Sequence, residues 1–160
     1  MCGRYVLYGP HFRLTELFGL QECPDLVPRY NIAPTSHVLV IRQRPEVERV
    51  GQMVRWGLVP NWAKDISIGA MLNNARSETV DTKLSFRNSF DKHRCLIPAN
   101  GFYEWKVVSE GGKVRRQPYY IRPAGELGFF AFAGLLARWR VPDGADLVTT
   151  CIIRPETRRQ

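Results

Sequence analysis

Short strand-like segments, divided by turn residues, run through most of this 160-residue chain and leave few folds open to it. They are rich in β-branched and aromatic residues, and Pro, Gly or Asp separates them. The segments are 37–42, 52–60, 94–98, 101–106, 118–122, 129–139 and 147–153. Two connections, EGGK at 110–113 and PDGAD at 142–146, have the composition of hairpin turns. The pattern predicts a fold dominated by antiparallel strands.

Two other segments have a helical apolar spacing, HFRLTELFGL at 11–20 and ETVDTKLSFRNSFDK at 78–92. No internal repeat, low-complexity run or Ser/Gly linker divides the chain. We therefore expect an α+β fold, a single domain over 1–160 that is dominated by antiparallel β-strands in a barrel-like sheet with a few short helices.

Composition limits the cellular compartments in which such a chain is expected to function. Hydrophobic residues make up 44% of it, which is enough to bury a core without cross-links. It contains no apolar stretch of about 18 residues and no signal-peptide pattern. The cysteines, at positions 2, 23, 95 and 151, lack the spacing of a zinc site or a disulfide framework, and isolated thiols suit a reducing cytosol. We expect a cytoplasmic monomer, nucleoid-associated in a bacterium, with no metal, no cofactor and no membrane partner.

The charge balance points to a polyanionic partner. Lys and Arg number 23 against 15 Asp and Glu, a net charge of +8. Such an excess favours nucleic acid, and most of the cations are arginines, which suit bidentate phosphate contacts. A GC-rich codon bias that turns surface Lys into Arg is the alternative, and charge alone does not decide.

Four stretches are denser in reactive and aromatic residues than structural strands need. They are MCGRY at 1–5, RWGLVPNW at 55–62, NNARSET at 73–79 and RCLIPANGFYEWK at 94–106. Each also has a structural interpretation. Cys2 is then a small residue at a tucked-in N-terminus, Trp56 and Trp62 are core residues, and Asn74 and Arg76 are a helix cap and a solvated side chain.

Glu104 is harder to explain as structure alone. It lies within the aromatic run of Phe102, Tyr103 and Trp105. Its structural interpretation is the outward face of a strand. A carboxylate packed among aromatic rings tends to have a raised pKa, however, and is a reasonable general acid.

In this order, the four stretches resemble the signature of the SRAP family (SOS response-associated peptidase), also called abasic site processing proteins. The resemblance runs from Met1 to about Thr150 and includes YNIAPT at 30–35 and FAFAGL at 130–135. It implies a protein that binds single-stranded DNA and crosslinks itself covalently to an abasic site, through the cysteine that becomes N-terminal once Met1 is removed.

An N-terminal cysteine suits this chemistry. Its α-amine, with a pKa of about 7.7–8.0, is partly neutral near pH 7 and can form a Schiff base with the open-chain aldehyde of an abasic sugar. The thiol of the same residue can then add to the imine carbon and close a thiazolidine ring. Only an N-terminal cysteine offers both groups in this arrangement. We therefore interpret Cys2 as a processed aminothiol.

The resemblance implies roles for the neighbouring residues. Asn74 matches the asparagine that hydrogen-bonds near the N-terminal residue, and Glu104 matches the acid/base glutamate. Arg4 and Arg76 match basic residues that clamp the phosphates flanking the lesion.

Trp56 and its neighbours up to Trp62 match an aromatic wedge on which an exposed base stacks. The resemblance thus implies that both tryptophans contact DNA.

The resemblance fails near the C-terminus. Family members carry a histidine there in a His-x-Arg-Met-Pro pattern, whereas this chain reads RPETRRQ at 154–160. His11, His37 and His93 lie in other motifs, so none takes that role. We therefore expect a domain that is incomplete at its C-terminus, with an uncovered sheet edge. Schiff-base formation, strand cleavage and crosslink reversal should be slower, by about 10²- to 10⁴-fold for one lost acid/base.

The sequence is compatible with three functions. The favoured one is an abasic-site sensor that attaches itself covalently to DNA, with Met1 removal and lyase cleavage as accessory activities. The second is an N-terminal-cysteine thiol peptidase, which needs an oxyanion hole and a base that the sequence does not offer clearly. The third is a non-catalytic single-stranded DNA-binding relative.

Overall fold

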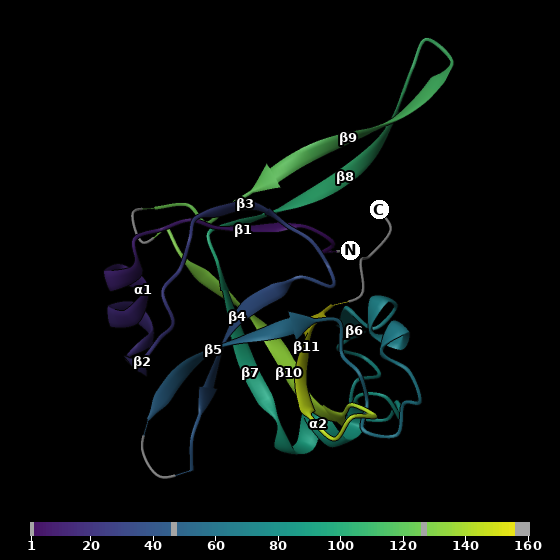
Figure 1. Cartoon of the computed structure of the whole chain (residues 1–160). Coiled ribbons are helices and arrows are strands. Elements are labelled where there is room, and N and C mark those ends of the chain that lie inside the picture. The colour runs from purple at the N-terminus through teal and green to yellow at the C-terminus, as the bar shows by residue number, and fades with distance from the viewer. Residues whose placement is uncertain (1, 46–47, 126–127, 156–160) are drawn as a thin grey trace.

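The computed structural model describes residues 2–45, 48–125 and 128–155 (Figure 1). The strands in chain order are β1 (Tyr5–Leu7), β2 (Leu20–Glu22), β3 (Arg29–Ile32), β4 (His37–Gln43), β5 (Arg49–Trp56), β6 (Asn74–Arg76), β7 (Arg94–Ala99), β8 (Gly101–Glu110), β9 (Lys113–Ile121), β10 (Phe130–Arg140) and β11 (Asp146–Arg154). The helical elements are α1 (His11–Phe18), the 3-10 helix η1 (Ile66–Ala70) and α2 (Arg87–Lys92). Among the described residues, no helix has the length and apolar character needed to cross a bilayer.

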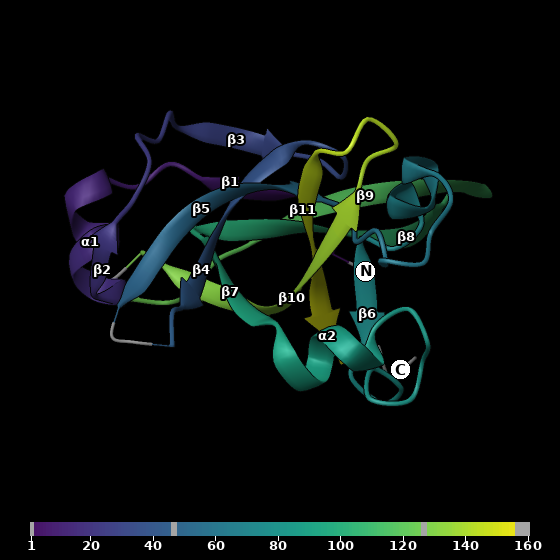
Figure 2. The same ribbon diagram turned by 60° about the horizontal axis from the view of Figure 1, so that its bottom comes forward.

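A closed barrel forms the body of the molecule. Its strands follow one another in the order β5, β4, β7, β10, β11, and β11 then pairs with β5 (Figure 2). Neighbours are antiparallel except at this closure, where Thr149 and Thr150 pair in parallel with Arg55 and Trp56. β2 and β6 extend the sheet from β5 and β11. The predicted barrel-like, mainly antiparallel fold is confirmed.

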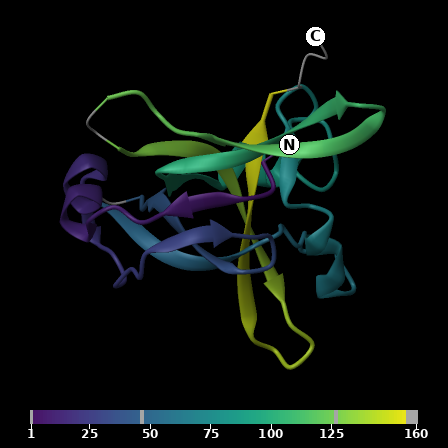
Figure 3. The same ribbon diagram turned by 90° about the horizontal axis from the view of Figure 1, so that it is seen from above.

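A second antiparallel sheet, in the order β3, β1, β8, β9, lies across one end of this barrel. Viewed from above, the purple β1 and green β8 and β9 cross the yellow β10–β11 hairpin (Figure 3). The buried Tyr5 ring of β1 packs edge-on against Trp56 of the barrel, with ring centroids 5.3 Å apart. The far half of the β8–β9 hairpin projects away from the body and turns through Gly111 and Gly112, both with positive φ.

Two predicted elements are shorter than expected. The segment 78–92 is helical only in α2, because turns precede it: Lys83 N–H donates to Thr79 O and Phe86 N–H donates to Lys83 O. The strand predicted at 52–60 ends at Trp56, since Gly57 has a φ of 129° and faces the Gly69 carbonyl, which would lie 2.5 Å from an added Cβ.

Candidate active site

Cys2 is buried at the barrel end that the second sheet covers. Only 6% of the residue is exposed. The Asn74 side-chain amide donates from Nδ2 to the Cys2 carbonyl oxygen at 2.9 Å and to Asn73 Oδ1 at 2.7 Å. The other end of that amide, Asn74 Oδ1, is buried and has no hydrogen-bond partner among the described residues. An acceptor beside Cys2 is therefore available to a ligand or to a new donor.

The register of β6 against β11 brings Asn74 to this place. The two strands are parallel, with Asn74 beside Ile152 and Arg76 beside Arg154. Ala75 is fully buried in the core, and successive side chains of a strand point to opposite faces. Asn74 and Arg76 therefore share the other face of β6. The register also brings Arg154 next to Arg76, a neighbour that the sequence did not reveal.

Glu104 acts electrostatically on the Cys2 thiol. Burial, with a smaller contribution from the Glu104 carboxylate, raises the pKa of this thiol to about 12, against a hydrogen bond from the Arg4 backbone N–H that lowers it. The thiol is consequently neutral at pH 7. The structure thus gathers Cys2, Asn74 and Glu104, three side chains that are far apart in the sequence.

A groove of about 750 Å³ has Gly3 and Arg4, the two residues that follow Cys2, in its lining. Its walls include Tyr103 and Trp105 of β8 and Arg116 of β9. Tyr103 and Trp105 lie on the face of β8 opposite Glu104 by strand alternation, and their ring centroids are 6.4 Å apart. An arginine-lined groove with neighbouring aromatic rings has the composition of a single-strand binding surface.

Trp56 does not line a surface, so the prediction that it stacks on an exposed base is wrong for this structure. Its side chain is fully buried, and its indole Nε1 donates to the Asn73 carbonyl at 2.9 Å. The closure of the barrel encloses this ring, which the sequence alone did not show. Trp56 instead holds the backbone next to Asn74 in place.

Trp62 is 48% exposed but lies in a different pocket, of about 210 Å³, with Leu84 and His93. The lining of this pocket shares no residue with the groove beside Arg4. Contact of Trp62 with DNA stays a prediction. The aromatic residues of the groove include the exposed Tyr30 and Trp105, and sequence reasoning treated Trp105 only as a neighbour of Glu104.

Asn100 and Gly101 explain part of the motif that carries Glu104. Asn100 is buried, and its Oδ1 accepts hydrogen bonds from the backbone N–H groups of Tyr8 and Gly9 at 2.7 and 3.1 Å. A Cβ at position 101 would lie 2.4 Å from the Tyr120 ring. Both residues fix the start of β8 against its neighbours, and so fix the position of Glu104. Sequence reasoning assigned them no role.

The remaining predictions concern the other cysteines, metal binding and the two termini. Cys23, Cys95 and Cys151 are free thiols, the last two buried. The described part of the chain contains no group of three or more His, Cys, Asp or Glu side chains able to hold a metal ion. Met1 and most of the basic tail, 156–160, lie outside the described residues.

Comparison with known proteins identifies relatives of this chain. The profile of the SOS response associated peptidase (SRAP) family matches residues 1–160. The chain is 40% identical over 156 residues to the abasic site processing protein YoqW of Bacillus subtilis, covering 96% of this chain and 67% of that protein. It is 38% identical over 159 residues to YoaM of the same organism, covering 98% and 68%. A crystal structure of a Bacteroides thetaiotaomicron protein superimposes with a TM-score of 0.81 at 26% identity, covering 97% of this chain and 68% of that one.

The relatives are longer, and the match takes in about two thirds of the two Bacillus proteins but nearly all of this chain. Fold, motifs and identity point the same way. The chain therefore belongs to the SRAP family, SOS response associated peptidases that include the abasic site processing proteins.

Proposed function

We propose that residues 1–160 act as one SRAP domain that senses abasic sites in single-stranded DNA and crosslinks itself to them through a processed Cys2. The observation that carries the proposal is the meeting of Cys2 with the Asn74 amide and the Glu104 carboxylate. The groove beside Arg4 and Trp105 supports it, because it offers the phosphate and base contacts that a single strand needs. The Bacillus relatives YoqW and YoaM are abasic site processing proteins by name, which indicates the same substrate.

The first step forms an imine. Removal of Met1 leaves the α-amine of Cys2, and burial favours the neutral, nucleophilic form of an amine over its ammonium. The nitrogen attacks C1′ of the open-chain aldehyde, and one water leaves as the C=N bond forms. Asn74 fixes the Cys2 carbonyl, and its unpartnered Oδ1 can accept a hydrogen bond from the amine or from a sugar hydroxyl.

The second step closes the ring. The Cys2 thiol, whose pKa burial raises, must lose its proton as the sulfur bonds to the imine carbon. The Glu104 carboxylate is the nearby base that can take this proton and return it to the nitrogen, whose double bond to carbon becomes single. No proton is gained or lost overall. The product is a thiazolidine that differs from protein plus DNA by one water.

Intact-mass spectrometry tests the proposal directly. The protein is incubated with a single-stranded oligonucleotide that carries one abasic site, and Cys2→Ala is treated in parallel. We expect loss of Met1 and a stable adduct one water lighter than the sum of protein and DNA, with no adduct for Cys2→Ala although the variant still binds the strand. A processed protein that binds without a mass shift would support a binding module and would overturn the crosslinking proposal. Cleavage of a peptide panel without any adduct would favour the thiol peptidase.

A further inference from the structure

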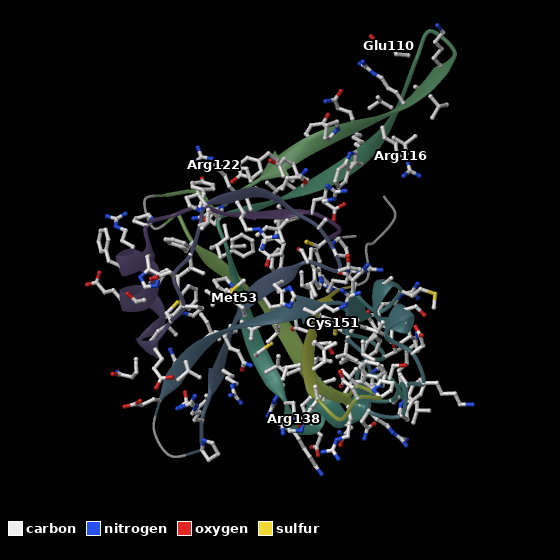
Figure 4. The ribbon with its side chains drawn as sticks, viewed as in Figure 1. Met53, Glu110, Arg116, Arg122, Arg138 and Cys151 are labelled. Atoms are coloured by element: carbon white, nitrogen blue, oxygen red, sulfur yellow. The ribbon has the colours of Figure 1, made fainter. Side chains whose placement is uncertain are left out.

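The barrel end opposite Cys2 contains a polar pocket that the proposed chemistry does not use. It lies where β4 and β10 end and where β5, β7 and β11 begin. The cavity measures about 290 Å³. Its lining residues are Arg42, Gln52, His93, Leu136, Arg138 and Val148, together with Ala137. Figure 4 shows Arg138 on the side of the molecule away from the β8–β9 hairpin and its Arg116.

Strand alternation explains why this pocket exists. Val38 and Val40 on β4 are buried in the barrel core, and Arg42 is the next residue on the same face. On β10 the buried Leu136 is followed on its face by Arg138. Arg42 and Arg138 therefore follow the interior layers of the barrel, and the buried Leu136 forms an apolar floor of the pocket that both arginines line.

The cations of this pocket are only partly balanced. Arg138 Nη1 lies 3.4 Å from Asp146 Oδ2, and Arg140 Nε shares the same carboxylate at 3.5 Å from Oδ1. Arg42 Nε is buried and lacks a hydrogen-bond partner within the described ranges. A buried donor without an acceptor is costly, so an anion at this place would be stabilised. His93, which also lines the pocket, adds ring nitrogens.

We propose that this pocket binds a phosphate group between Arg42 and Arg138. Two guanidinium forks in the lining of one cavity suit the tetrahedral oxygens of phosphate, and the Gln52 amide can add a neutral donor. The apolar floor excludes water from one side and so strengthens these contacts. Phosphate is the shared chemistry of two sources, a free phosphomonoester and a phosphodiester of a bound nucleic-acid strand. The proposal does not depend on the crosslinking reaction.

A titration with inorganic phosphate at constant ionic strength is the first test. Amide chemical shifts are followed in the processed protein, with chloride as the comparison anion. We expect saturable shifts at residues 42, 93 and 138 and none at residues 74 and 104. Arg42→Gln and Arg138→Gln should each weaken binding about tenfold, the usual scale for one charge-assisted contact.

Arg94→Gln is the matched control, since it removes the same charge from β7 while the buried Cys95 places position 94 on the outer face of the barrel. It should change the phosphate affinity less than about twofold, as an uninvolved surface charge does. Arg42→Lys keeps the charge but loses the forked guanidinium group, so it should bind phosphate with intermediate affinity. If Arg42→Gln does not fold, this variant provides the test at position 42. Absence of saturable shifts in the unaltered protein, or equal weakening by Arg94→Gln, would overturn the proposal.

A second measurement separates the two sources of phosphate. The affinity for a single-stranded oligonucleotide is measured against salt concentration for the unaltered protein and for the Arg42→Gln, Arg138→Gln double variant. A phosphodiester in the pocket predicts a salt slope smaller by about one for the lost phosphate contact. An unchanged slope together with lost phosphate affinity assigns the pocket to a free phosphomonoester.

Discussion

The two ends of the barrel handle polar groups in opposite ways. At the Cys2 end, a second sheet covers the barrel, and a small number of polar groups is buried among hydrogen bonds and apolar rings. At the far end, Arg42 and Arg138 line a pocket with an apolar floor, and Arg138 shares the Asp146 carboxylate with Arg140. The same strand alternation thus yields a covered site that can tune proton affinities and an open one that can attract charge.

The largest effect should come from the residue that fills the covered end. Trp56→Ala removes a fully buried ring and the hydrogen bond to Asn73, so we expect the free energy of unfolding to fall by about 3–5 kcal/mol. Trp62→Ala, at a half-exposed ring, should cost less than about 1 kcal/mol. Urea unfolding measures both. Similar losses for the two variants would contradict the assignment of Trp56 to the core.

A smaller effect on stability but a large one on rate is expected for Asn74→Ala. The substitution frees the Cys2 carbonyl, and misplacement of a reacting group by about 1 Å can cost a hundredfold in rate. The measurement is single-turnover adduct formation with saturating abasic-site oligonucleotide, with the exposed Asn88→Ala as control. Unchanged kinetics in Asn74→Ala would remove this residue from the site.

We expect the groove to contribute to the affinity for DNA and to take no part in the crosslinking reaction. Trp105→Ala deletes a ring from the groove wall, and we expect the affinity for undamaged single-stranded DNA to fall about tenfold, the scale of one lost stacking contact. Tyr119 is the control, because it pairs with Glu104 across the hairpin, lines no part of the groove and is 50% exposed against 43% for Trp105. Equal losses for Trp105→Ala and Tyr119→Ala would point to a general effect of the hairpin.

The smallest effect concerns the thiol. Glu104→Gln removes a negative charge that helps to raise the pKa of Cys2, so this pKa should fall while staying above its ordinary value, since burial is the larger cause. The pH dependence of Cys2 alkylation, followed by peptide mapping, measures the shift. Glu110→Gln, at the hairpin tip, is the control and should change nothing. An unchanged or higher pKa in Glu104→Gln would contradict the electrostatic influence of Glu104 on the thiol.

The sign for stability follows from the same shift. The pKa of the Cys2 thiol is higher in the folded protein than its ordinary value of 9.0, so the folded state holds this proton more tightly. The protonated thiol therefore contributes to the stability of the folded state below pH 9, and this contribution is lost as the pH rises toward about 12. Because Glu104→Gln should lower the pKa of Cys2 in the folded protein, the stabilisation should be lost at a lower pH than in the unaltered protein.

Sequence patterns located the long strands, four of them closely, and the short strands not at all. β4, β7, β10 and β11 fall close to the segments expected, because six or more residues give several repeats of the strand period, whereas β5 begins and ends earlier than expected and β8 and β9 extend further into their shared hairpin. β1, β2, β3 and β6 have only three or four residues, too few for a period to appear. Their positions depend on partners that are distant in the sequence.

The candidate site shows the same division. Cys2, Asn74 and Glu104 were predicted through the resemblance to a family, whereas their meeting depends on strand registers that no local pattern contains. The burial of Trp56 and the pocket between Arg42 and Arg138 both result from closure of the barrel. Such features arise from tertiary pairing, so the strand propensities of single residues cannot predict them.

The parallel pairing of β6 with β11 also sets the order in which the site can be assembled during synthesis. Cys2 leaves the ribosome first, but Asn74 is held by a strand whose neighbour in the sheet, β11, is made far downstream. Pairing over such a separation closes a long loop and is slow. A nascent chain therefore carries its nucleophile without the residue that orients it, and the reactive end matures only after the barrel has closed.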